Sequence, residues 1–416
     1  MATDTAYADD ATARSHDDGL PPPFHQFVLK VHSRCNLACD YCYLYQGPDS
    51  TWRDHPARVS GAVMRRTAAR IAEHLERHRM RSARIDLHGG EPLLGGPGTA
   101  VEYAAAVRRA APADCELRFF VQTNGTLLTP HALAELAAAG IRVGLSLDGG
   151  SAALNRRRTD HAGRPSWPAA SRAARLLARS PEQYAGILCT IDLAQDPLAV
   201  YDSLAALAPP TLDLLLPHAN WATPPPGVPD PGRPARAARA TPYADWLAPV
   251  FDRWWERGRS AGPDGGTGPR IRLFEEVVAL LLGAPSAVES LGGAPAAAVV
   301  VETDGSVEQV DSLRFTRHGG AATGCDVFRH GFDAVRGSLG PGPRPAADCL
   351  RCPVGRVCGG GNPAHRYEPR TGLRNPSVYC ADLEALIRHI GAALASCRSG
   401  EAGELPAANS RSPSVK

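Results

Sequence analysis

The chain has 416 residues, 44% of them hydrophobic, and a formal net charge of only +2, which allows one large globular domain and a smaller one. This charge gives no reason to expect nucleic acid or an anionic membrane as a partner. No stretch reaches the roughly 18 consecutive apolar residues of a membrane span, and the acidic N-terminus does not resemble a secretory signal. We therefore expect a cytoplasmic protein whose 11 cysteines bind metal rather than form disulfides.

Strand-like and helix-like runs alternate between two segments of disordered composition, 1–23 and 398–416. The strand-like runs are Gln26–His32, Ala83–His88, Glu116–Thr123, Arg142–Leu147, Tyr184–Ile191 and Thr211–Leu216. The helical patterns between them are Val63–His78, Gly98–Ala111, Pro130–Ala139, Trp167–Ser180 and Pro197–Leu207. These β–α units predict an α/β fold over residues 24–235, a partial (β/α)6 barrel with its chemistry at the C-terminal ends of the strands.

The pattern changes after a Pro-rich segment, 224–234. Two helices, Tyr243–Glu256 and Ile271–Leu282, are expected in a helical bridge of residues 236–297. A hairpin with its turn at Asp304–Gly305 follows. Residues 298–397 are otherwise loop-rich and carry cysteines, which predicts a small domain held together by metal.

Three cysteines form a first cysteine group directly after the first predicted strand: Cys35, Cys39 and Cys42, in SRCNLACDYCYLYQ. Three thiolates can hold three irons of a [4Fe–4S] cluster, whereas most such clusters have four cysteine ligands. The motif resembles that of radical S-adenosylmethionine (SAM) enzymes, including Tyr41 before the last cysteine, and in that family SAM binds the open iron. A zinc site or three core thiols are the alternatives, but zinc needs a fourth ligand and none is adjacent.

Motifs at the ends of the next two predicted strands are consistent with a SAM site. The second strand ends in HGGEP, where Gly89 and Gly90 let the backbone approach a ligand and the Glu91 carboxylate can accept bonds from the SAM ammonium. The third strand ends in TNG, which contains Asn124. Each motif alone is weak evidence, but their order on the ends of successive strands argues against a chance occurrence.

The fourth predicted strand ends in SLDG, where Ser146 and Asp148 alternate onto one face. Their hydroxyl and carboxylate groups suit the ribose hydroxyls of SAM. Arg158, in LNRRRTD, is a candidate for the SAM carboxylate. The alternative for an arginine in a basic run is a solvated surface position.

A second cysteine group lies in DCLRCPVGRVCGGG and NPSVYC: Cys349, Cys352, Cys358 and Cys380. Four thiolates can hold structural zinc or an Fe–S cluster, and spacing alone favours zinc modestly. The group resembles the second half of a SPASM domain, the auxiliary-cluster module of peptide-modifying radical SAM enzymes. That resemblance implies one auxiliary [4Fe–4S] cluster.

The resemblance extends over residues 24–396 and is closest to the FxsB-type maturases. It rests on FVLKVHSRCNLACDYCYLY, IDLHGGEPLL, LLPHANW, YADWLAPVFDRWW, VVVETDGSVEQVDSL and CGGGNPAHRY followed by NPSVYCADL. Those maturases form three-residue cyclophanes, linking an aromatic ring to a nearby Cβ, in a ribosomally made precursor peptide. The implied partners are that peptide and a flavodoxin- or ferredoxin-like electron donor.

Two positions depart from the SPASM pattern. Val310 and Asn362 stand where cysteines are usual, and Cys325 remains alone. The first of the two SPASM clusters is therefore expected to be absent.

The implied reaction begins when SAM is cleaved to a 5′-deoxyadenosyl radical, which takes a hydrogen from a peptide Cβ. The carbon radical then adds to an aromatic ring, and one electron and one proton leave. Asp326 is the first candidate for the proton acceptor, because it follows Cys325 where related sulfatase maturases carry an acid; Asp311 and Glu308 come next. The alternative for Asp326 is a surface or capping role.

Two other functions stay open. One is thioether or formylglycine formation on a peptide or protein. The other is an Fe–S redox sensor without turnover, against which HGGEP and SLDG argue because a sensor needs no SAM site.

Overall fold

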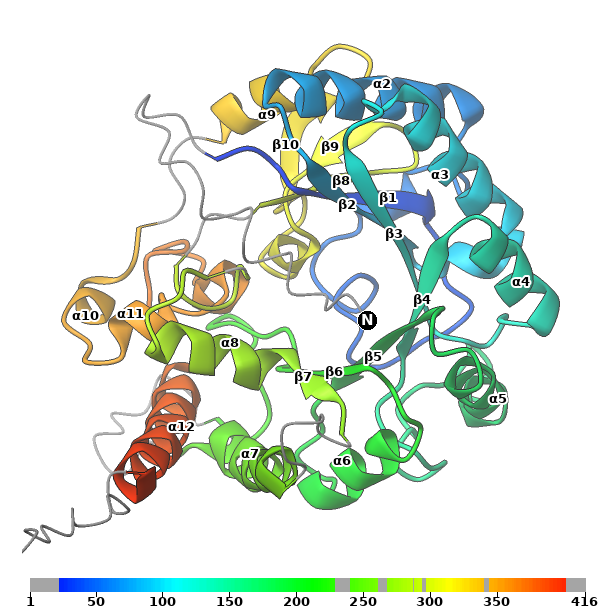
Figure 1. Ribbon diagram of the computed structural model, residues 1–416. Coiled ribbons are helices and arrows are strands. Elements are labelled where there is room, and N and C mark those ends of the chain that lie inside the picture. Colours follow the sequence, from blue (N-terminus) through cyan, green and yellow to red (C-terminus); the bar gives the residue numbers. More distant parts are fainter. Residues whose placement is uncertain are drawn as a thin grey trace, which may run out of the picture.

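The computed structural model describes residues 22–228, 240–260, 268–286, 288–293, 297–339 and 344–401. Six parallel strands stand side by side in chain order with helices around their outer face (Figure 1). They are β1 Gln26–His32, β2 Ser82–Gly89, β3 Glu116–Thr123, β4 Ile141–Ser146, β5 Tyr184–Thr190 and β6 Thr211–Leu215. The expected α/β partial barrel is confirmed, and the six predicted strands agree with these bounds to within one residue at either end.

Helices connect successive strands and cover one face of the sheet: α2 Gly61–Arg77, α3 Gly98–Ala110, α4 Pro130–Ala138, α5 Trp167–Ala178 and α6 Pro197–Ala205. Three of them begin at a residue whose side chain accepts a hydrogen bond from a backbone N–H of the first turn. These caps are Ser60, Thr129 and Asp196. The caps fix where each helix starts, and so they fix the length of the loop that leaves the strand before it.

Alternation along the strands separates the core from the barrel interior. In β1, Phe27, Leu29 and Val31 are buried in the main core with the helices. Lys30 lies between them and points to the opposite face of the strand, where it meets Asp311. In β1, buried apolar side chains thus face the helices, and Lys30 faces the barrel interior.

The C-terminal part of the chain extends this sheet rather than forming a separate one. Strand β8 Ala298–Val301 pairs in parallel with β1, and β9 Ser306–Glu308 and β10 Ala322–Asp326 follow in antiparallel order. The predicted turn lies between β8 and β9, where Gly305 has φ +93°. At the other end, β7 Arg270–Ile271 pairs with β6, which gives ten strands in one sheet among the described residues.

The remaining elements are divided between the barrel and the C-terminal part of the chain. They are α7 Pro242–Ser260, α8 Arg272–Leu281, α9 Phe332–Ser338, α10 Ala347–Leu350, α11 Gly355–Cys358 and α12 Cys380–Glu401, with the 3-10 turns η1 Thr51–Arg53, η2 Pro92–Gly95, η3 Asp311–Phe315 and η4 Pro363–Arg366. Helix α12 packs on α7 and α8 (Figure 1). The prediction of disorder from residue 398 is wrong for the first four residues, because α12 continues to Glu401.

Other expectations of disorder fall mostly outside the described residues. Of the predicted N-terminal segment, residues 1–21 lie outside them, as do residues 402–416 of the tail; residues 229–234 of the Pro-rich segment also lie outside the described part of the chain. Within the described part of the chain, no helix has the length and apolar character that a membrane crossing requires.

Candidate active site

The first cysteine group lies on the loop after β1, in a setting that suits bound iron. Burial raises the pKa of Cys35 to about 12 and that of Cys39 to about 11, and it also raises the pKa of Cys42. Thiols held this way ionise only when a cation replaces their protons. The Leu37 N–H and the Asn124 amide point at the Cys35 sulfur, at 3.4 and 3.8 Å. Three thiols with donors aimed at one sulfur fit the predicted cluster.

The glycines at the end of β2 make room for this loop. A Cβ on Gly89 would lie 2.1 Å from the His32 carbonyl oxygen, and one on Gly90 would lie 1.9 Å from the Tyr45 hydroxyl. Only glycine tolerates such close neighbours. We expected the glycines to leave space for a ligand; the structure shows that the cysteine loop uses this space, and contact with SAM stays a prediction.

Glu91 ties the ends of β2 and β3 together. Its side chain is fully buried, and its carboxylate accepts bonds from Thr123 Oγ1 at 2.7 Å, Asn124 N–H at 2.8 Å and Leu93 N–H at 3.0 Å. Burial raises the pKa of Glu91, and these donors oppose that shift. Glu91 therefore positions Asn124 beside the cysteine loop, a task that the sequence did not indicate.

Tyr41, Asp148 and Arg158 form a buried polar triad between the cysteine loop and the end of β4. The Tyr41 hydroxyl donates to the Asp148 carboxylate and accepts from Arg158 Nη1 at 2.7 Å. Arg158 also lies 3.6 Å from Asp148 Oδ1, and its side chain is 11% exposed. The solvated-surface alternative for Arg158 is therefore wrong. Ser146 lies nearby at the end of β4, where it accepts a bond from Gln122 at 2.9 Å.

The four residues of the second cysteine group lie in the short helices α10 and α11, in the turn between them, and at the first residue of α12. Burial raises the pKa of Cys358 to about 11, and the other three thiols of the group add to this shift. The three residues after Cys358, Gly359 to Gly361, have φ of +64°, +90° and +71°, a conformation that glycine adopts readily. The glycine run therefore forms the tight loop expected beside the cysteines.

A cluster rather than zinc at the second cysteine group stays a prediction. In the described ranges, no group of three potential ligand atoms that includes a cysteine sulfur lies within 4.8 Å.

Asp326, the first candidate base, closes a turn at the end of β10. Its carboxylate accepts from the backbone N–H groups of Phe328 and Arg329, both at 2.9 Å, and pairs with the Arg329 guanidinium at 2.5 Å. Burial acts to raise the pKa of Asp326, but these bonds together outweigh it, and the pKa lies below its usual range. The capping alternative describes its observed contacts, and a role as base stays a prediction.

Asp311 and Glu308 belong to a buried network around Arg314, which we call the Arg314 network. Arg314 is 2% exposed and contacts four carboxylates: Asp49 at 2.8 Å, Glu302 at 2.6 Å, Asp311 at 3.4 Å, and Glu308. Asp311 also pairs with Lys30 at 2.5 Å. Burial and the neighbouring carboxylates raise the pKa of Glu308 to about 7, although Arg314 opposes this shift.

Sequence reasoning missed several interior residues. Lys30 and His88 face each other at 3.5 Å from β1 and β2, and His218 follows β6. Burial lowers the pKa of His88 and of His218 to about 4 in each case. Alternation within the strands could have placed Lys30 and His88 on the inner face. No local signal indicates what His218 contacts.

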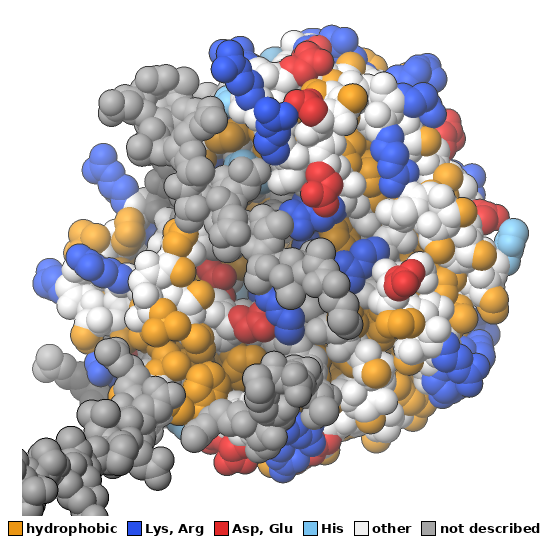
Figure 2. Space-filling view, viewed as in Figure 1, with side chains coloured by type: hydrophobic (Ala, Val, Ile, Leu, Met, Phe, Trp, Pro, Cys, Tyr) orange, Lys and Arg blue, Asp and Glu red, His pale blue; other side chains and the backbone are white. Residues whose placement is uncertain are grey.

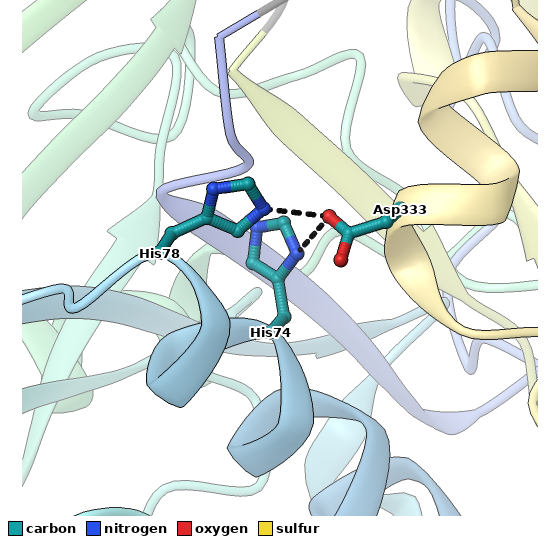
Figure 3. A group of neighbouring side chains, drawn as sticks. All are labelled: His74, His78 and Asp333. Atoms are coloured by element: carbon teal, nitrogen blue, oxygen red, sulfur yellow. Dashed lines mark hydrogen bonds and ion pairs between the residues drawn. The ribbon is translucent and has the colours of Figure 1, made fainter.

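A third cluster, His74, His78 and Asp333, joins α2 to α9 (Figure 3). His74 Nδ1 lies 3.0 Å and His78 Nε2 2.7 Å from Asp333 Oδ1. The His74 Nε2 atom accepts the Phe24 N–H at 3.1 Å, so the proton of the neutral ring is on Nδ1, facing Asp333. Because this tautomer leaves His74 no lone pair for a metal on that side, we interpret the cluster as a hydrogen-bonded clasp.

Positively and negatively charged side chains are mixed on the face of the molecule that Figure 2 shows, with hydrophobic side chains between them. This agrees with the small net charge.

Comparisons with known proteins identify the class of this fold. Residues 29–180 match the Radical SAM superfamily. The structure resembles "Native anSMEcpe with bound AdoMet", with a TM-score of 0.71, 20% identity and coverage of 90% of this chain and 99% of that one. A second structure, "Native anSMEcpe with bound AdoMet and Kp18Cys peptide", gives a TM-score of 0.72 at 20% identity, covering 91% and 100% of the two chains. The fold is therefore the radical SAM α/β fold.

Curated relatives agree with this class. A serine-type anaerobic sulfatase-maturating enzyme of Klebsiella pneumoniae is 27% identical over 352 residues, 83% of both chains. The corresponding enzyme of Klebsiella aerogenes is 32% identical over 189 residues, a match that spans 45% of each chain. A cysteine-type enzyme of Clostridium perfringens (strain 13 / Type A) is 24% identical over 292 residues, covering 70% of this chain and 75% of that enzyme.

The match to the Radical SAM superfamily thus covers residues 29–180, which hold the first cysteine group and the C-terminal ends of β1 to β4. The cofactors characteristic of that superfamily are a [4Fe–4S] cluster and SAM, which confirms both predicted cofactors at the level of class.

Proposed function

We propose that this protein is a radical SAM enzyme that oxidises a residue of a peptide at its Cβ. The observation that carries the proposal is the 27% identity over 83% of both chains with a serine-type sulfatase-maturating enzyme. One of the solved structures that share this fold contains a bound peptide. The bound cluster and SAM would supply the deoxyadenosyl radical.

The residues around the first cysteine group would hold the cofactors. The three thiols would bind three irons, and Asn124, positioned by Glu91, would face the ligand of the fourth. The triad of Tyr41, Asp148 and Arg158 presents a cation and an anion beside this loop, which suits the charged and hydroxyl groups of SAM. Ser146 would contribute a further hydroxyl.

The second cysteine group would hold one auxiliary [4Fe–4S] cluster that accepts the electron released by the substrate. The resemblance of this group to the second half of a SPASM domain supports a cluster over zinc. At Val310 and Asn362, the positions without cysteines, the chain has other contacts: Val310 packs with Leu313 and Ala364, and Asn362 donates to Glu289 at 2.9 Å. These contacts support a single auxiliary cluster.

Two products fit this chemistry. Formylglycine formation is the closer one to the sulfatase-maturating relatives. Cyclophane formation is favoured by the departures at Val310 and Asn362 together with the FxsB-type motifs. Both begin with loss of a Cβ hydrogen and end with loss of one electron and one proton, so they need the same two cofactor sites.

One experiment separates the products. The anaerobically reconstituted protein would be given SAM, a reductant and one of two kinds of peptide: the Kp18Cys peptide, or one with an aromatic residue two places before a residue that carries Cβ hydrogens. Deoxyadenosine and peptide mass are measured, with and without hydroxylamine.

A hydroxylamine adduct would identify an aldehyde and hence formylglycine. Loss of two hydrogens without an adduct, placed by fragmentation on a ring carbon and a Cβ, would identify a cyclophane, and the same loss on a cysteine sulfur a thioether. Deoxyadenosine without any change in either peptide would contradict the proposal. The matched control is a variant with alanine at all three positions of the first cysteine group.

A further inference from the structure

Four aromatic rings form a continuous row between the two cysteine groups. Tyr43 lies 4.4 Å from His218, His218 lies 5.5 Å from His365, and His365 lies 4.9 Å from Tyr379, measured between ring centroids. We call these four residues the ring row. The distances place each ring in contact with the next.

Both ends of the ring row are joined covalently to the cysteine groups. Tyr43 follows Cys42, and Tyr379 precedes Cys380. The row thus starts one residue from a ligand of the predicted SAM cluster and ends one residue from a ligand of the predicted auxiliary cluster. It crosses from the barrel, at the end of β6, to the turn η4 of the C-terminal part.

Hydrogen bonds hold the row in place. The Tyr379 hydroxyl donates to the Pro217 carbonyl oxygen at 2.6 Å, directly before His218. The Val378 N–H donates to the His365 carbonyl oxygen at 2.9 Å, directly before Tyr379. Since these bonds join residues at or beside three of the rings, they hold His218, His365 and Tyr379 in place relative to one another.

The two histidines in the middle of the row each bury a nitrogen in a way that lowers the free energy of unfolding. Among the described residues, none gives a hydrogen bond to Nδ1 of His218 or Nε2 of His365, and both atoms are buried. A buried polar atom without a partner destabilises a protein by about 1–3 kcal/mol. Packing alone would be served as well by leucine, so the rings themselves call for an explanation.

We propose that the ring row is the path by which one electron passes between the two cysteine groups. This rests on the proposed function in one respect, that each group holds a cluster. The substrate radical loses one electron to the auxiliary cluster and one proton to a base. The row then returns the electron to the SAM cluster, which has given one electron to SAM.

The electron count closes without another oxidant. SAM and the peptide yield methionine, deoxyadenosine, the oxidised peptide and one proton, and the electron that starts the cycle is recovered. The two histidine rings need not change their protonation. Burial lowers the pKa of His218 to about 4 and that of His365 well below its usual range, so both rings are neutral near pH 7.

The test measures electron transfer between the clusters and needs no peptide. The reconstituted holoprotein is photoreduced with less than one electron per chain, frozen at set times, and its two cluster signals are followed by electron paramagnetic resonance. His218→Leu and His365→Leu remove a ring at similar volume, and His218→Phe and His365→Phe keep one. Both kinds of change remove the buried unpartnered nitrogen, so the fold is not expected to lose stability.

The leucine variants should equilibrate several-fold more slowly than the wild type, and the phenylalanine variants should stay close to it. His131→Leu, at an exposed histidine paired with Glu135, is the control and should match the wild type. Wild-type rates in the double leucine variant, with iron content unchanged, would overturn the path. Iron for one cluster only would also overturn it, while leaving the radical SAM assignment in place.

Discussion

Replacing Arg314 by methionine is expected to destabilise the protein strongly and in a pH-dependent way. The guanidinium faces four carboxylates, and among the described residues Lys30 is the only other lysine or arginine paired with them. Removing one partner from a buried ion pair costs about 3–5 kcal/mol, because the remaining charge stays buried and unpaired. For a chain of this size that corresponds to a fall of roughly 3–6 °C in Tm.

The sign of the pH dependence distinguishes this cause from lost packing. Glu308 already has its pKa raised to about 7 while Arg314 is present, and loss of Arg314 would raise it and the pKa of its neighbours further. When the pKa of a carboxyl group is higher in the folded than in the unfolded state, the free energy of unfolding of the protein falls as pH rises from the unfolded-state pKa to the folded-state pKa. The deficit of Arg314→Met relative to the wild type should therefore be larger at pH 8 than at pH 5.5.

Thermal melts of the anaerobic holoprotein at both pH values would measure this deficit. Arg388→Met is the matched control, because Arg388 is 56% exposed and pairs with Glu384 one helical turn away, a contact worth about 0.3–0.5 kcal/mol. A deficit equal to that of the control, or one that grows toward pH 5.5, would refute the reasoning.

Four further predictions concern the cofactors, the base and acid stability. Alanine at all three positions of the first cysteine group should abolish deoxyadenosine formation, while Cys115→Ala, at a buried position outside both cysteine groups, should retain it; cleavage of SAM by the triple variant would refute the site. Iron analysis should give about eight irons per chain for two [4Fe–4S] clusters, and about four irons with one zinc would instead favour a structural second site. If Asp326 is the base, Asp326→Asn should keep SAM cleavage and block product, and a normal product would move the role to Asp311 or Glu308. Finally, burial lowers the folded-state pKa of His74 to about 4, so the unfolded chain binds a proton at His74 before the folded protein does as pH falls below 6.5. Urea unfolding should therefore show that the free energy of unfolding falls between pH 6.5 and 4, by up to about 3 kcal/mol for this histidine. A free energy of unfolding that does not change over this range would contradict the burial of His74.

The strands of the barrel and the two cysteine groups could be predicted from local patterns in the sequence. Strands such as Gln26–His32 and Glu116–Thr123 were predicted to the residue, because an apolar strand bounded by polar turn residues is a local pattern. The first cysteine group and the motif that contains Glu91 are likewise local, since their ligands lie within a few residues of one another. Strand β10 was missed because its sequence, ATGCD, has neither alternation nor β-branched residues beyond Thr323.

Only the tertiary structure decided how distant residues combine. Arg158 could be read as a surface residue until the fold placed it against Tyr41 and Asp148. Asp311 meets Lys30, 281 positions away, only because the hairpin of β8 and β9 adds to the edge of the barrel at β1. The ring row joins four segments in the same way. Such contacts depend on how strands and turns far apart in the chain are packed, and no local pattern of residues encodes that arrangement.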